Sequence, residues 1–296
     1  MPEHHTRPAQ NAPVALLMLL VVTIMFSFGD MLSKMTVVTI HPTQIFFVRC
    51  VIVASVVVPA VYFRKGRSVF HSERPKTQIF RGICILLSSL LFVSGLYYLP
   101  LADANALNAV WPLLITVLSV FFLGEKVGIR RWVATIVGFC GMLLIIRPGT
   151  SAFQAAALLP LLSAFTWSMA TLTARSMSAH DRAETTIVWS SLVMLAGSCL
   201  LVPFYWVQPT MREWALMGAI GIVSIIGHSL MVFAYERASA SFLAPFSYTQ
   251  LLWSVTFGYL AFGAVPDSWM AAGACLIVGS GIYTAHREHV RAGSGQ

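Results

Sequence analysis

The sequence predicts an all-α integral membrane protein of ten transmembrane helices, arranged as two inverted five-helix repeats. Three observations lead to this fold class: charged residues are few, apolar residues gather into ten long runs, and the two halves of the chain resemble each other. Charged residues make up 10% of the chain and hydrophobic residues 57%. A soluble protein carries roughly 25% charged residues. The chain therefore has too few charges to cover itself with a water-facing surface.

Each apolar run approaches the ~20 residues that a helix needs to cross a bilayer. Helices are expected because lipid offers no partners to backbone N–H and C=O groups. Turn signals such as His41-Pro42 and Leu99-Pro100 separate the runs, and the links are too short for a separate soluble domain. The first run is expected to remain as an uncleaved anchor. The ten runs lie at 13–33, 42–63, 79–99, 104–123, 131–147, 153–174, 185–205, 214–235, 240–262 and 268–285.

The links predict how the chain crosses the membrane. Most Lys and Arg residues fall in links on the side of the N-terminus, whereas links on the other side hold only Lys34, Arg147 and Arg212. The positive-inside rule then places both the N- and the C-terminus in the cytoplasm. Nothing resembles an organelle address, so the expected location is a bacterial inner membrane. The same bias explains the net charge of +8, and no nucleic-acid partner is needed.

Residues 1–150 and 151–296 are the two predicted repeats. The end of the first run, FSFGDMLSKM (26–35), matches the end of the sixth, WSMATLTARSM (167–177), so that Lys34 corresponds to Arg175. The fourth run, NAVWPLLITVLSVFFLG (108–124), likewise matches the ninth, SYTQLLWSVTFGYLAFG (247–263). Five crossings are an odd number, so the second repeat must cross with opposite polarity. Inverted repeats with a site near the midplane are a recurrent plan of secondary transporters.

Polar and aromatic side chains share one face of several runs. Ser27 and Asp30 do so in the first run, and Asn105 and Asn108 do so in the fourth. Converging stripes predict a central cavity. For a single Ser or Thr, bonding between neighbouring helices is the alternative that stays open. The candidate cavity-lining, substrate-binding residues are Ser27, Asp30, Tyr97, Asn105, Asn108, Trp111, Trp167, His228, Tyr235, Ser247, Tyr248, Gln250 and Trp253.

Three ionisable residues are the candidates for coupling or gating: Asp30, Arg49 and Glu125. Asp30 is a candidate for a carboxylate that binds a proton or contacts a cation, and an ion pair with Lys34 is the alternative. Arg49 contacts an anionic solute, snorkels to the membrane surface, or has a structural role at carbonyl groups. Glu125 lies at the end of the fourth run beside Lys126, a place typical of a boundary or gating charge.

Local patterns give three further predictions. Asp103 is expected to be the N-cap of the fourth helix. Pro112 and Pro245 are expected to bend the fourth and ninth helices. Glycines of the fifth and tenth runs, among them Gly141 and Gly273, predict close helix packing or homodimer contacts.

No arrangement typical of an enzyme stands out in the sequence. It contains no HExxH, P-loop or dinucleotide-binding pattern, and its five cysteines are scattered through apolar runs. We therefore expect no catalysis, metal or cofactor. Two function classes remain: a transporter of a small molecule, and a non-transporting membrane sensor or scaffold. A water-filled cavity lined by the polar stripes would favour the transporter.

Six segments of the chain form an ordered set: DMLSK (30–34), FFVR (46–49), YLPLADANAL (98–107), FFLGEKVGIRRW (121–132), GHSLMVFAYERASASFLAPFSYTQLLWS (227–254) and PDSWMAAGACLIVGSGIY (266–283). Through these segments the chain resembles the drug/metabolite transporter superfamily, specifically its EamA type. The resemblance implies ten helices in two inverted repeats and either ion-driven or facilitated movement of a small metabolite, with H⁺ as the candidate coupling ion. It implies amino-acid-like solutes, or flat aromatic ones such as riboflavin or S-adenosylmethionine. The second repeat has Ala264 where the first has Glu125, so a role that needs both carboxylates is in doubt.

Overall fold

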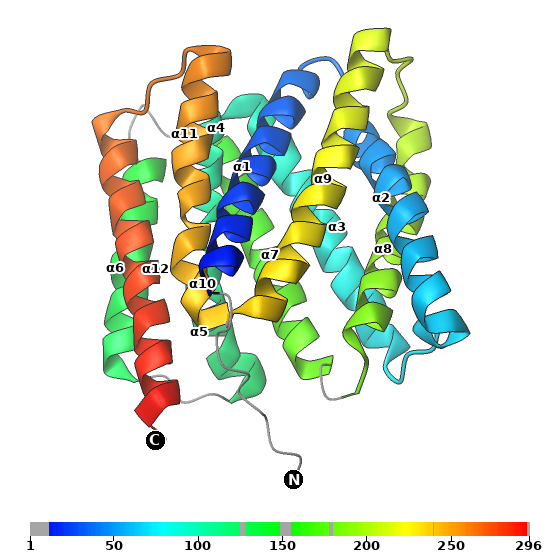
Figure 1. Cartoon of the computed structure of the whole chain (residues 1–296). Helices are drawn as coiled ribbons and strands as arrows, with labels where there is room; N and C mark the ends of the chain where they lie inside the picture. Colours follow the sequence, from blue (N-terminus) through cyan, green and yellow to red (C-terminus); the bar gives the residue numbers. More distant parts are fainter. Residues whose placement is uncertain (1–11, 125–127, 149–154, 178–179, 239, 295–296) are drawn as a thin grey trace.

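All elements formed by the described residues are helices, which confirms the all-α prediction. The computed structural model describes residues 12–124, 128–148, 155–177, 180–238 and 240–294 (Figure 1). Three short 3-10 helices are η1 (Gly66–Phe70), η2 (Ala155–Ala157) and η3 (Val202–Phe204). The α-helices are α1 (Ala12–Thr36), α2 (Pro42–Lys65), α3 (Pro75–Tyr98), α4 (Leu101–Asn108), α5 (Trp111–Leu123), α6 (Ile129–Ile146), α7 (Leu158–Met177), α8 (Ala183–Leu201), α9 (Met211–Arg237), α10 (Ala240–Ser247), α11 (Thr249–Phe262) and α12 (Ser268–Ser294).

The apolar helices make this a multi-pass membrane protein. Within the described residues, seven helical segments are long and apolar enough to cross a bilayer, and the segment Leu101–Phe122 spans both α4 and α5. Two shorter apolar helices, Trp132–Ile146 and Ser268–Thr284, lie beside each other in α6 and α12. We call the end of the bundle where α1 begins and α12 ends the proximal end, and the opposite end the distal end (Figure 1).

Two helices are interrupted partway through the bundle. The first break separates α4 from α5 at Ala109 and Val110, and Pro112 follows in the first turn of α5. The second break falls at Tyr248, between α10 and α11, so Pro245 lies inside α10 rather than at the break. The prediction that Asp103 caps α4 is wrong: Pro100 occupies the N-cap position, and Asp103 belongs to the first helical turn.

The two interrupted helices also end alike. Gly124 follows α5 with φ 65°, and Gly263 follows α11 with φ 64°. Glycine adopts this left-handed conformation without the steric cost that a Cβ brings, so both positions are C-caps that favour glycine. The breaks and the caps therefore fall at corresponding places in the two halves of the sequence.

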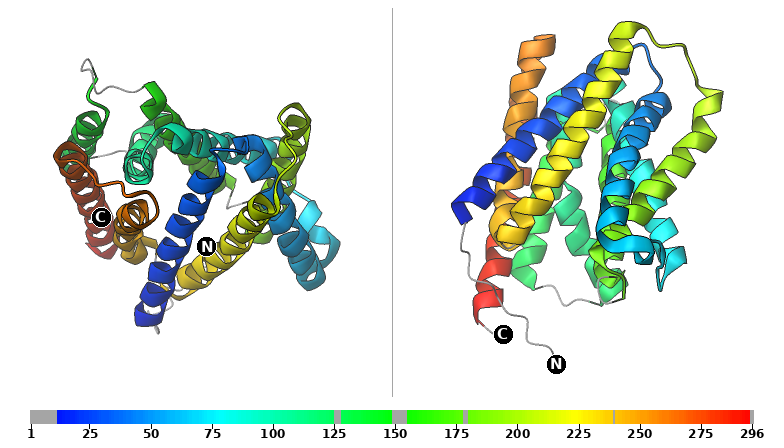
Figure 2. Two further views of the ribbon diagram at one scale, coloured as in Figure 1. Left: turned by 90° about the horizontal axis from the view of Figure 1, so that it is seen from above. Right: turned by 45° about the vertical axis from the view of Figure 1, so that its right-hand side comes forward.

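The most extensive helix pairs join the first half of the chain to the second. These pairs are α1 with α9, α6 with α12, α3 with α7 and α2 with α8 (Figures 1 and 2). The α6–α12 pair approaches closely because it meets at glycines: a Cβ on Gly141 would lie 2.6 Å from the carbonyl oxygen of Gly273. The predicted close packing of these two glycine-containing helices is therefore present within one chain.

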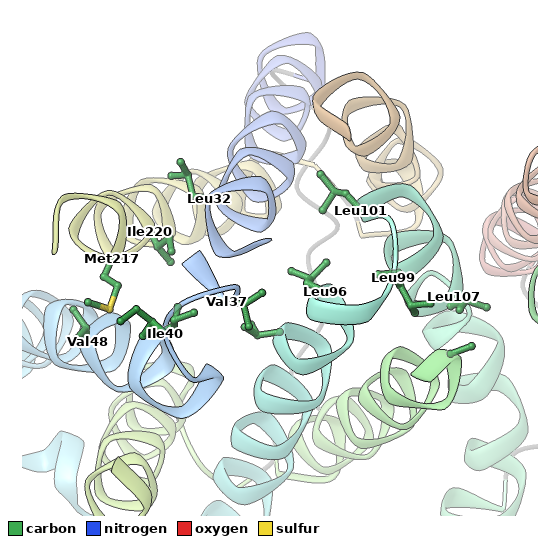
Figure 3. Close-up of a cluster of buried hydrophobic side chains, with 14 of the residues drawn as sticks. Leu32, Val37, Ile40, Val48, Leu96, Leu99, Leu101, Leu107, Met217 and Ile220 are labelled. Atoms are coloured by element: carbon green, nitrogen blue, oxygen red, sulfur yellow. The ribbon is translucent and has the colours of Figure 1, made fainter. Parts of the chain in front are cut away.

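The largest group of buried apolar residues fills the distal half of the bundle. It includes Leu32 of α1, Leu96 and Leu99 at the end of α3, Leu101 of α4 and Met217 of α9 (Figure 3). All of these except Leu32 are less than 5% exposed. In a bilayer such side chains stabilise helix contacts through close van der Waals packing, and this cluster joins the distal ends of α1, α2, α3, α4 and α9.

Candidate functional site

Four of the predicted residues meet where α1, α4 and α11 come together. The Gln250 side-chain amide on α11 donates to Asp30 Oδ2 of α1 and to Asn105 Oδ1 of α4, each at 3.3 Å. Ser27 of α1 donates to the Gln250 carbonyl oxygen at 2.8 Å. Gln250 is thus the central residue, because it joins a carboxylate and an amide from two other helices. Gln250 is the second residue of α11, directly after the break at Tyr248.

The neighbours of this cluster hold it in place. Asn105 donates to the Leu101 carbonyl oxygen at 3.2 Å, which fixes which of its side-chain atoms faces Gln250. Thr23 of α1 and the Thr249 hydroxyl of α11 lie 3.0 Å apart. Helix α1 therefore contacts α11 through two polar positions separated by one turn, Thr23 and Ser27.

Arg49 lies near the cluster on α2, half-buried, and is a cationic neighbour of both Asp30 and His228. Its guanidinium stands over the Phe46 ring at 5.2 Å. Within the described residues, Arg49 makes neither a hydrogen bond nor an ion pair, and Asp30 makes no ion pair. The side chains of Asp30 and Arg49 are therefore neighbours of opposite charge inside an apolar bundle that do not form an ion pair.

The alternative that Asp30 pairs with Lys34 is not what the structure shows. Lys34 Nζ instead donates to the carbonyl oxygens of Leu96 and Leu99 at 2.8 and 2.6 Å. These oxygens belong to the C-terminal end of α3, which carries the negative end of the helix dipole. The hydrogen-bonding neighbours of Asp30 are therefore the amides of Gln250 and Asn105 rather than the Lys34 ammonium.

His228 of α9 contributes from the facing helix. Its Nδ1 lies 2.8 Å from the Ser224 carbonyl oxygen, and its ring stands 5.1 Å from that of Phe26 on α1. The side chain is nevertheless exposed. This combination leaves Nε2 available to a ligand while Nδ1 fixes the orientation of the ring.

Three predicted residues carry buried polar atoms that have no hydrogen-bond partner within the described part of the chain: Asn108 Oδ1, the Tyr248 hydroxyl and Trp253 Nε1. The Tyr248 hydroxyl points at α12, since a Cβ on Gly281 would lie 1.8 Å from it. Buried polar atoms in native structures are nearly always bonded to protein, water or a ligand. These atoms are therefore candidates for groups that a bound molecule or water satisfies.

The other predicted residues that the structure describes have different neighbours. Trp167 packs in the cluster formed by Cys84 and Ile85 of α3, and the Trp111 carbonyl oxygen accepts a hydrogen bond from Ser168 at 2.9 Å. Tyr97 is 53% exposed at the distal end of α3. The remaining predicted positions are Tyr235 (exposed, towards the proximal end of α9), Ser247 (last residue of α10) and Glu125, which is outside the described residues.

Sequence reasoning missed a set of polar contacts at the two ends of the bundle. At the proximal end, Asp181 accepts hydrogen bonds from Ser72 and from the backbone N–H of Glu73. At the distal end, the Gln44 amide exchanges two hydrogen bonds with the backbone of Val207. The only signal was the presence of amide and carboxylate groups beside turns, which is too general to single them out.

The cluster is suited to binding rather than to covalent chemistry. It offers a carboxylate, a guanidinium, two amides and an imidazole, so it can hold charged and hydrogen-bonding groups of a small molecule. Among the described residues, no three His, Cys, Asp or Glu side chains gather in a way that could hold a metal ion.

Comparison with known proteins gives one family and several relatives. The EamA-like transporter family matches residues 13–147 and again residues 154–284. The chain is similar to the S-adenosylmethionine uptake transporter of Rickettsia bellii, with 27% identity over 88% of this chain and 90% of that protein. It is similar to the riboflavin transporter of Vibrio cholerae, with 31% identity over 80% of each chain.

Two further matches extend the comparison. The pseudopaline exporter CntI of Pseudomonas aeruginosa is 28% identical over 86% of this chain and 89% of that protein. A solved crystal structure superposes with a TM-score of 0.63 at 22% identity, covering 93% of this chain and 98% of the other. That likeness shows a shared fold.

Proposed function

The chain belongs to the EamA-like transporter family, and from this premise we propose that it is a secondary transporter of a small organic metabolite that works by alternating access. The family match confirms the resemblance to the drug/metabolite transporter superfamily. The observation that carries the proposal is the Gln250 cluster, in which residues of both halves of the chain present unlike polar groups to one another inside an apolar bundle.

The proposed architecture is ten membrane-spanning helices in two inverted repeats, 1–150 and 151–296. The double family match supports it, as do the corresponding breaks of the fourth and ninth spans and their equivalent glycine caps. Counting α4 with α5 and α10 with α11 as one interrupted span each, the seven long apolar segments, the two shorter helices and the α10–α11 span make ten. Interrupted helices at the midplane are a recurrent feature of secondary transporters.

We place the proximal end in the cytoplasm of a bacterial cell, with the protein in the inner membrane. The end of α2 and its link to α3, both at this end, hold Arg64, Lys65, Arg67 and Arg74. Cytoplasmic links are the ones enriched in Lys and Arg. Both termini would then be cytoplasmic.

The solute that best fits the site is a zwitterion of the amino-acid type. Asp30 offers a negative charge for an amino or other cationic group, and Arg49 offers a positive charge for a carboxylate. Burying two charges without an ion pair is costly, and a ligand that bridges them removes much of this cost. Ser27, Asn105 and Gln250 would orient the same ligand. A flat neutral ring system would leave both charges unmatched.

Asp30 is also the proposed proton-binding group. In an apolar bundle a carboxylate without a cationic partner is stabilised by taking up a proton, so solute binding and protonation would compete for it. The asymmetry at Glu125 and Ala264 leaves Asp30 as the carboxylate on which such coupling would rest.

The test is ligand-dependent thermal stability of the purified protein in detergent. Amino acids, S-adenosylmethionine, nucleosides and flavins form the panel, each at a hundred times its expected Kd, where binding stabilises the folded state by about 2.7 kcal/mol. We expect a rise in melting temperature with a zwitterion. The rise should disappear in Gln250→Leu and persist in the matched variant Gln44→Leu, which removes the same amide at the distal end.

Uptake of the stabilising compound into proteoliposomes then separates transport from binding. A transporter moves it, and Gln250→Leu abolishes that movement. Stabilisation without movement would favour a membrane sensor, and a flat neutral compound as the only stabiliser would overturn the zwitterion proposal.

A further inference from the structure

Lys34 joins three helices at the distal end of the bundle, and we call such a basic side chain at a helix end a clasp. Its ammonium donates to the carbonyl oxygens of Leu96 and Leu99, at the end of α3, and lies 5.6 Å from the ring centre of Phe262, at the end of α11. One side chain of α1 thus joins the distal ends of α3 and α11. Hydrogen bonds from a charged donor to helix-end carbonyls are among the stronger contacts a side chain makes.

The two ends of the bundle are packed unequally. At the distal end α1 packs on α3 and α4 packs on α11, next to the largest apolar cluster (Figure 3). The corresponding proximal pairs are α7 with α9 and α5 with α10. Over the described residues, neither of these pairs packs to a comparable extent. This structure is therefore closed at its distal end.

The second half of the chain contains the counterpart of the clasp. Arg175 is the basic residue in the last turn of α7, as Lys34 is in the last turn of α1. The counterpart of the α3 end is the α9 end. Leu99 caps α3 by donating its N–H to Gly95 O at 3.0 Å, and Ala238 caps α9 by donating to Ala234 O at 3.1 Å. Both caps have extended backbone and precede a short helix, α4 or α10.

We propose that Lys34 and Arg175 are two alternating clasps, so that Arg175 bonds the C-terminal carbonyls of α9 when Lys34 releases those of α3. The carbonyls that correspond to those of Leu96 and Leu99 are those of Tyr235 and Ala238. Each clasp closes one end of the bundle and uses the same chemistry, a cation at the negative end of a helix. The inference rests on the proposed alternating-access function and assigns the residues that close each end.

The experiment is hydrogen–deuterium exchange of the purified full-length chain without any solute. In Lys34→Met the distal clasp is lost, so backbone amides at the end of α3 and in α4 should exchange about tenfold faster or more, in keeping with the strength of charge-assisted hydrogen bonds. Amides in the last turn of α9 and in α10 should at the same time exchange more slowly, because the proximal clasp closes. Lys34→Arg, which keeps the charge, should behave like the unaltered protein.

The double variant Lys34→Met with Arg175→Met decides the matter. Backbone amides at the distal end should still exchange fast in this double variant. The slower exchange in the last turn of α9 and in α10 should not occur, because the second clasp is missing. If the slowing persists in the double variant, or if Lys34→Met never produces it, the proposal is wrong.

Arg175→Met alone gives an independent check, since Arg175 is exposed and its replacement does not disturb a packed core. Solute-induced stabilisation should remain while transport is lost, because the molecule binds solute but cannot close its proximal end. Transport at the unaltered rate would overturn the proposal. Because the exchange measurement needs no solute, its outcome is separate from whether the solute class has been identified.

Discussion

Asp181 should be one of the most stabilising side chains at the proximal end of the bundle. It lies between α7 and α8, is 9% exposed, and accepts hydrogen bonds from three groups around the start of α3. These donors are the Ser72 hydroxyl at 2.5 Å, the Glu73 N–H at 2.9 Å and the Gln78 amide at 2.7 Å. One carboxylate thus ties the α2–α3 link to the α7–α8 link.

The variant Asp181→Ala removes all three bonds. A hydrogen bond to a charged group contributes about 1.5–3 kcal/mol, but the three share one acceptor and do not add fully. Gln78 is fully buried and keeps only the Thr186 hydroxyl, at 3.1 Å. We therefore expect a loss of about 3 kcal/mol. With a shift of about 2–4 °C per kcal/mol, the melting temperature should fall by about 6–12 °C.

The pH dependence has a definite sign. Burial on its own raises the pKa of Asp181, but the hydrogen bonds from Ser72, the Glu73 N–H and Gln78 outweigh it and hold the pKa below the ordinary value of 3.8. The stability from this carboxylate is therefore fully present above the unfolded-state pKa and is lost as the pH falls through the lower folded-state pKa. Between pH 5 and 8 the difference between Asp181→Ala and the unaltered protein should stay constant.

The assay is a thermal melt in detergent of Asp181→Ala, Gln78→Leu and the double variant. Because the two side chains bond each other, the double variant should melt clearly higher than the sum of the single losses predicts. A melting temperature for Asp181→Ala within 2 °C of the unaltered protein, or strictly additive losses, would refute the reasoning.

Three other predictions concern the remaining helix contacts. Gly141→Leu should prevent proper folding, because a Cβ there already meets the carbonyl oxygen of Gly273 at 2.6 Å, and size-exclusion chromatography after detergent extraction should show aggregate. Asp267→Asn should lower the melting temperature near neutral pH, and this difference should shrink as the pH falls below 3.8. The hydrogen bond from Arg147 leads the effects that depress the Asp267 pKa, so the stabilisation is lost as the pH falls through the lowered folded-state pKa. Gln44→Leu should lower the melting temperature by about 2–4 °C, because two hydrogen bonds to the backbone before α9 are lost; an unchanged melt would show that water replaces them.

The sequence was most informative about features that long periodic patterns predict, namely the helices and the internal repeat. Apolar runs predicted the helices, and the comparison of the two halves aligned Lys34 with Arg175 and the fourth run with the ninth. Ser27 and Asp30 were predicted to share one helical face, and in the structure both contact Gln250. Gln250 itself is conspicuous in the sequence because it is an amide within an apolar run.

The sequence was less informative where tertiary contacts decide. Lys34 lies one turn from Asp30, so an ion pair was a reasonable local expectation, yet the end of α3 offers it two carbonyl oxygens. Pro245 predicted a bend, but the break falls at Tyr248, whose hydroxyl lies against Gly281 of α12. Trp167 is predicted to line the cavity, and the sequence did not indicate that its packing neighbours would be Cys84 and Ile85 of α3. In each case the deciding partner is remote in the chain, so no local pattern could have indicated it.

The pairing of helices across the two halves has a consequence for biosynthesis. Helices α1, α3 and α6 find their main partners in α9, α7 and α12, which the ribosome makes much later. Contacts between residues so distant in sequence form slowly. Helices α1, α3 and α6 must therefore remain in the bilayer without these partners until the second half of the chain is made. A nascent chain that stalls before α12 would leave α6 unpaired and would be a substrate for membrane quality-control proteases.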